Sequence, residues 1–111
     1  MNWLYLVIAG VFEIAWAIGL KYTDGFTRVW PSTVTVMAMI ASFYFLAQAL
    51  KTIPVGTGYA VWTGIGAAGT AILGIVLFAE STALLRLVSL VLIVTGVVLW
   101  MVIDIEREIP I

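Results

Sequence analysis

The sequence contains neither cysteine nor histidine, and only 10% of its 111 residues are charged. Without cysteine the chain has no disulfides, no thiolate metal sites and no cysteine nucleophile. Without histidine, any proton exchange near neutral pH falls to a carboxylate. We also find no nucleophile–base pair, metal-ligand cluster or phosphate-binding loop, so we expect neither an enzyme nor a cofactor. A net charge of −1 and the lack of a basic patch argue against nucleic acid as a partner.

Apolar side chains are what the chain has in excess. Hydrophobic residues make up 64% of it, and the mean hydropathy is +1.20. Soluble domains are about 45–50% apolar and about 25% charged, so this composition is typical of a protein in a lipid bilayer. The first apolar run has no basic segment before it and is too long for a cleaved signal peptide, so we expect it to stay in the membrane.

Four apolar runs are separated by short polar connectors. A helix needs about 20 apolar residues to cross about 30 Å of hydrocarbon, and each run meets that length. The connectors are too short to hold a second domain, so the sequence predicts an all-α membrane protein in which residues 1–111 form a single transmembrane domain. The four predicted helices cover residues 3–20, 30–50, 55–78 and 87–103.

Glu13 lies in the middle of the first run, within the stretch AGVFEIAWAIGL. It follows Trp3, an expected interfacial residue, by about 15 Å along a helix, which places its carboxyl group near the bilayer midplane. An acidic side chain there costs about 2.5–3.5 kcal/mol and usually faces a cavity or a partner. A protonated carboxyl that only joins helices is the alternative. Because no basic residue in any run could neutralise it, we favour a functional carboxylate.

Polar and aromatic side chains from three runs are expected at the depth of Glu13. Helical spacing places Gly10 and Trp16 on the same face as Glu13, and the Trp16 indole N–H could donate to the carboxylate. Ser42 lies near the midplane of the second run. Each of these residues could simply pack, but their common depth favours a shared polar pocket. One face of the third run adds Tyr59, Trp62, Thr63 and Gly66.

Small residues are concentrated in the third run, which holds six of the ten glycines. Small residues let helices approach closely in lipid. Gly64 and Gly66 also predict a bend in the helix beside the pocket, because glycine weakens a helix locally. The alternative is that these glycines only allow tight packing. In the fourth run, Ser89 and Gly96 lie two turns apart and predict a seam between two copies of the chain.

These features resemble the small multidrug resistance transporters, and within that family the guanidinium exporters, from Met1 to about Trp100. The string from Trp16 to Lys21 is the feature most typical of that subtype. The motifs that carry the resemblance are AGVFEIAWAIGLKYTDGFTR (9–28), PSTVTVMAMIASFYFLAQALKTIPVGTGYAVWTGIGA (31–67) and RLVSLVLIVTGVVL (86–99).

The resemblance implies an antiparallel homodimer of four-helix protomers in the bacterial inner membrane, which exports guanidinium cations in exchange for protons. It implies that Glu13 binds both the proton and the substrate, that Trp16, Ser42 and Tyr59 form its hydrogen-bonding network, and that Trp62 is an aromatic wall. Two other functions stay open: export of quaternary ammonium and other lipophilic cations, and a subunit that acts only with a related chain.

Three features depart from the pattern of the guanidinium exporters. Gly58 stands where alanine is usual, and Val98–Leu99–Trp100 replaces the usual Gly-Leu-Lys ending of the fourth helix. The tail DIEREIPI is longer and more acidic than the pattern. None of these departures touches the predicted pocket directly.

Overall fold

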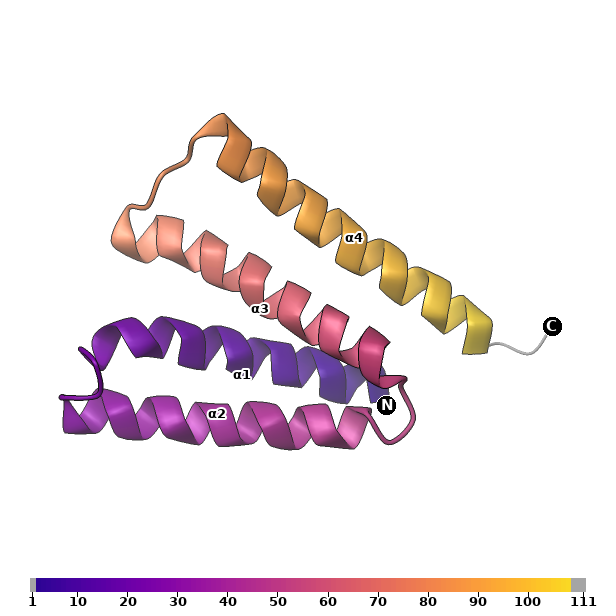
Figure 1. Ribbon diagram of the computed structural model, residues 1–111, viewed down its shortest axis with the longest axis horizontal. Helices are drawn as coiled ribbons and strands as arrows, with labels where there is room; N and C mark the ends of the chain where they lie inside the picture. The colour runs from indigo at the N-terminus through magenta and orange to yellow at the C-terminus, as the bar shows by residue number, and fades with distance from the viewer. Residues whose placement is uncertain (1, 109–111) are drawn as a thin grey trace.

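The computed structural model describes residues 2–108, which form four α-helices joined by short connectors (Figure 1). The last three residues of the acidic tail, 109–111, lie outside the described residues. Each helix is long and apolar enough to cross a membrane, which confirms the four predicted spans and a multi-pass membrane protein. The helices are α1 (Asn2–Tyr22), α2 (Val29–Ala49), α3 (Val55–Phe78) and α4 (Leu84–Glu108).

The helices end close to the polar connectors between the apolar runs, and α4 differs most from its predicted range. It begins at Leu84 rather than at residue 87, and it continues beyond residue 103 to Glu108. Leucine, arginine and glutamate are strong helix formers, so the helix extends past the apolar run at both ends. α4 is therefore longer than its apolar run.

The connector between α1 and α2 reverses the chain through three consecutive left-handed residues. Asp24, Gly25 and Phe26 have φ values of 49°, 70° and 66°. The Thr23 hydroxyl supports this turn, because it donates to the Leu20 carbonyl oxygen at 2.7 Å and accepts the Phe26 N–H at 3.2 Å. This short turn places α1 and α2 side by side and antiparallel.

The four helices are packed unevenly. α1 lies against both α2 and α3, whereas α4 contacts only α3 in the described part of the chain and runs antiparallel to it (Figure 1). No residue from Leu84 to Asp104 is buried. The buried apolar core therefore belongs to the first three helices and the connector between α2 and α3. Its members are Leu6, Ala9, Leu46, Ala49, Ile53, Val61 and Trp62.

Glycines on α3 bring its neighbours close. A Cβ atom at Gly66 would overlap the carboxyl group of Glu13, and one at Gly64 would overlap the Val97 side chain of α4. In lipid, such close packing replaces the hydrophobic effect as the force between helices. Both glycines therefore have a packing role. α3 is helical without interruption through them, and the bend at Gly64 and Gly66 stays a prediction.

We expect Gly64→Ala to destabilise the protein by about 1–3 kcal/mol, the usual cost of overpacking. The added methyl group would overlap Val97, a stiff β-branched side chain. Gly56→Ala is the matched control, because a Cβ there meets nothing within 4 Å, and it should change stability by less than about 0.5 kcal/mol. Unfolding in detergent, followed by helical circular dichroism, measures both. Equal effects of the two substitutions would contradict the packing role of Gly64.

Candidate functional site around Glu13

Glu13 lies halfway along α1, and its carboxyl group is packed over Gly66 of α3. The space for the carboxyl group exists because Gly66 has no side chain. Glu13 is partly buried, and its Oε1 atom is buried without a hydrogen-bond partner among the described residues. Leaving a buried polar atom unpaired costs about 1–3 kcal/mol, and more for a charged group. The carboxyl group is therefore poised to take a proton or a donor from outside the chain.

Trp16 lies one turn beyond Glu13 on α1 and has a similar unused group. Its indole Nε1 is buried and has no hydrogen-bond partner in the described chain. The hydrogen bond from Trp16 to Glu13 that spacing allows is therefore not made in this structure. Adjacent turns of α1 instead offer one free acceptor and one free donor.

Ser42 and Trp62 form a hydrogen-bonded unit that joins three helices. The Ser42 hydroxyl donates to the Ala9 carbonyl oxygen of α1 at 2.7 Å and accepts the indole N–H of Trp62 at 2.9 Å. Both side chains are buried. In this structure Ser42 thus fixes the Trp62 ring and the α1 backbone, and its hydrogen bonds do not go to Glu13.

Tyr59 and Thr63 lie on the side of α3 that faces α4. They line a mostly apolar groove of about 500 Å³ between the two helices. Tyr59 is 57% exposed, and its ring centre lies 5.6 Å from that of Trp62. Tyr59 therefore lines the groove on one side and lies beside the ring that Ser42 holds on the other.

Gly10 lies against α3, as Glu13 does. A Cβ at Gly10 would overlap the Ile65 side chain, which is next to Gly66 in the chain. Gly10 thus lets α1 and α3 pack closely one turn before Glu13.

Phe43 is a site residue that the sequence analysis does not single out. Its ring centre lies 6.4 Å from that of Trp16 and 5.6 Å from that of Trp62, so it joins the aromatic residues of α1 and α3. The sequence feature that could have indicated Phe43 is its position next to Ser42, at the same depth along the second apolar run. Trp16, one turn from Glu13, is thus the first of three neighbouring aromatic rings, and such rings attract organic cations.

No group of three histidine, cysteine, aspartate or glutamate side chains that could hold a metal ion is found among the described residues. The described residues around Glu13 offer charge, hydrogen bonding and aromatic contact, which suit the binding of a small cation.

Comparison with known proteins identifies relatives of the whole bundle. The family model described as Small Multidrug Resistance protein matches residues 1–93, a range that includes every residue named around Glu13. The chain is 60% identical over 98 residues to a guanidinium exporter of Yersinia pseudotuberculosis, a match that covers 88% of this chain and 94% of the relative. It is 61% identical over 98 residues to a guanidinium exporter of Escherichia coli strain K12, covering 88% and 93%, and 56% identical to one of Proteus vulgaris, covering 88% and 94%. The chain therefore belongs to the small multidrug resistance family.

Proposed function

We propose that the protein exports guanidinium and small substituted guanidinium cations across the bacterial inner membrane in exchange for protons, with Glu13 as the shared binding site. The observation that carries the proposal is the position of Glu13, which lies in a helix long and apolar enough to span a membrane. Its carboxyl group is packed over Gly66, and its Oε1 atom has no hydrogen-bond partner among the described residues. The relatives named guanidinium exporters support the choice of substrate.

Guanidinium suits the chemistry of this site. It is planar and permanently charged, and its paired N–H groups match the two oxygens of a carboxylate. Aromatic rings attract a cation placed over their faces. Trp16 lies one turn from Glu13 on α1, and ring contacts lead from it through Phe43 and Trp62 to Tyr59. A quaternary ammonium ion has no N–H group to donate, so it would use only the charge and the rings.

Competition for one carboxylate is sufficient to couple the two flows. A proton neutralises Glu13 and removes the attraction for a cation, whereas a bound guanidinium stabilises the deprotonated form. The empty, charged carboxylate is costly inside the membrane, so it should rarely change sides. Acidifying one side therefore displaces guanidinium there, and an inward proton gradient drives export.

We further propose that two chains assemble antiparallel. Four helices enclose too little space for a solvated path, and none of the α4 side chains from Leu84 to Asp104 is buried. Ser89 and Gly96 lie on this exposed helix. The Ser89 hydroxyl bonds to its own helix at Leu85, and a Cβ at Gly96 meets nothing within 4 Å, so both leave room for a second copy.

The distribution of basic residues is consistent with insertion in both orientations. Basic residues near short loops set membrane topology. Lys21, Arg28 and Arg86 belong to one side of the membrane, and Lys51 and Arg107 belong to the other. Three against two is almost no bias, so both orientations of the chain should occur.

Glu13→Gln should abolish exchange without preventing assembly. Glutamine keeps the shape and the hydrogen-bonding capacity of the side chain but cannot take up or release the proton. We expect folded dimer by size-exclusion chromatography, and guanidinium-driven proton flux at the level of protein-free liposomes. Asp24→Asn, on an exposed loop, is the matched control and should behave as the wild type. Retained exchange in Glu13→Gln would place the coupling elsewhere.

The substrate should be guanidinium rather than a bulky lipophilic cation. Solid-supported membrane electrophysiology with equal concentrations of guanidinium and tetraphenylphosphonium compares them directly. We expect the larger current with guanidinium, because only guanidinium donates hydrogen bonds to the carboxylate. Large currents with tetraphenylphosphonium and none with guanidinium would overturn the proposed substrate.

Dual orientation is measurable with a single introduced thiol, because the chain has no cysteine of its own. A cysteine appended to the C-terminus should react with a membrane-impermeant maleimide from both sides of the inner membrane in comparable amounts. Labelling from one side alone would contradict the antiparallel homodimer.

A further inference from the structure

Trp100 fastens α4 to the beginning of α3. Its indole N–H is shared between the Thr57 hydroxyl of α3 and the Asp104 carboxylate, with both acceptors at 3.1 Å. Thr57 is only 7% exposed and lies in the first turn of α3. Asp104 lies one turn further along α4. This hydrogen bond therefore ties the carboxyl-terminal half of α4 to the amino-terminal end of α3.

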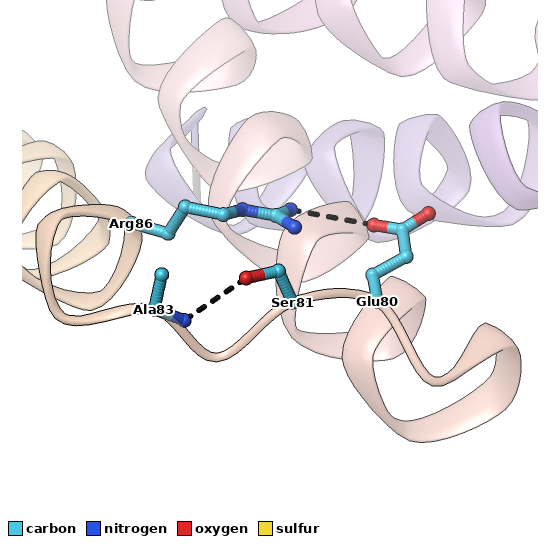
Figure 2. Close-up of polar contacts among 4 residues, drawn as sticks. All are labelled: Glu80, Ser81, Ala83 and Arg86. Carbon is cyan, nitrogen blue, oxygen red and sulfur yellow. Dashed lines mark hydrogen bonds and ion pairs between the residues drawn. The ribbon is translucent and has the colours of Figure 1, made fainter.

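A second contact ties the other ends of the same two helices. Figure 2 shows the Arg86 guanidinium reaching across the connector to Glu80, with Nη2 and Oε1 3.4 Å apart. The Glu80 carboxyl group in turn lies against Gly74, in the last turns of α3. Both charged side chains are more than 40% exposed, with values of 45% and 42%, and ion pairs of this kind contribute little. The Trp100 hydrogen bond is therefore the stronger of the two attachments.

The segment of α3 between these attachments is rich in glycine. It contains Gly64, Gly66 and Gly69, whereas α4 has a single glycine, Gly96. Glycine has the greatest conformational freedom of any residue and lowers helix stability by about 0.5–1 kcal/mol at each position. α4 also touches this segment directly, because Val97 fills the space beside Gly64. A stiffer helix thus lies along a weaker one and is attached on both sides of the weak segment.

We infer that α4 acts as a splint for the glycine-rich segment of α3, and that the hydrogen bond from Trp100 to Thr57 limits how far the first turns of α3 move relative to Glu13. Those turns carry Tyr59 and Trp62. Trp100, whose indole N–H bonds to Thr57 and Asp104, is therefore a positioning residue for these two rings. The consequence for transport rests on the proposed function, whereas the mechanical role does not. Trp100 also lies in the segment that departs from the pattern of the guanidinium exporters.

Hydrogen–deuterium exchange of the full chain in lipid nanodiscs tests the mechanical role. Trp100→Phe removes the donor and keeps the aromatic ring, and Thr57→Val removes the acceptor and keeps the shape. Each should speed amide exchange across residues 57–66 about five-fold, which corresponds to a hydrogen bond of ordinary net strength. The double variant should show no further acceleration, because both substitutions break the same bond.

Three control variants separate the splint from general loosening. Trp30→Phe removes an indole that is 79% exposed and should leave α3 unchanged. Thr57→Ser restores the acceptor and should restore slow exchange. Asp104→Asn weakens only the competing acceptor, so exchange in α3 should not accelerate. Faster exchange with Asp104→Asn, equal acceleration in all four helices, or additive effects in the double variant would overturn the inference.

Guanidinium transport by the same variants gives an independent readout. Displacing Tyr59 and Trp62 should weaken binding, so KM should rise about three- to five-fold in Trp100→Phe and Thr57→Val while the maximal rate changes less than about twofold. A purely structural role would instead lower the amount of active protein at constant KM and would overturn the positioning role. Failure of guanidinium exchange in the wild type would overturn the proposed function and leave the amide-exchange test of the splint intact.

Discussion

The contact on which the rest of this structure depends is that of the Glu13 carboxyl group with Gly66. A carboxyl group in a membrane-spanning helix needs space and a partner, and the missing side chain of Gly66 provides the space. No described residue pairs with Oε1. The folding of one protomer therefore leaves the Glu13 Oε1 atom unpaired, and a bound proton or cation would lower its free energy. Placing an expensive group there is consistent with a binding site rather than with a purely structural contact.

α3 is the helix that connects this contact to the rest of the molecule. Its face toward α1 carries Gly66, beside Glu13, and Trp62, whose ring Ser42 holds. Its face toward α4 carries Gly64, which lets Val97 approach. Any displacement of α3 thus changes the surroundings of Glu13 and the contact with α4 together. The packing is uneven, with a buried three-helix core and a more exposed fourth helix, so α3 is the element that connects α4 to the site.

The number of spans, their approximate limits and the depth of the polar residues are predictable from the sequence, because run length and helical spacing determine them. Which residues pair is not predictable in the same way. Ser42 has neighbours on two helices, and only the packing of α2 against α1 and α3 decides that it accepts from Trp62 and donates to Ala9. Gly10 shares a face with Glu13 and packs against Ile65, and helical spacing defines this direction but not the length of the opposing side chain. The hydrogen bond between Trp100 and Thr57 joins residues 43 positions apart, and no local sequence pattern indicates it.

The central claim is that one carboxylate binds either a proton or guanidinium. The most direct measurement is proton release when guanidinium binds to the purified protein in weakly buffered detergent solution, across a range of pH. We predict that the wild type releases protons at low pH, that the release diminishes as pH rises and Glu13 is already deprotonated, and that Glu13→Gln releases none. Guanidinium binding without proton release at any pH, or unchanged release from Glu13→Gln, would contradict the account.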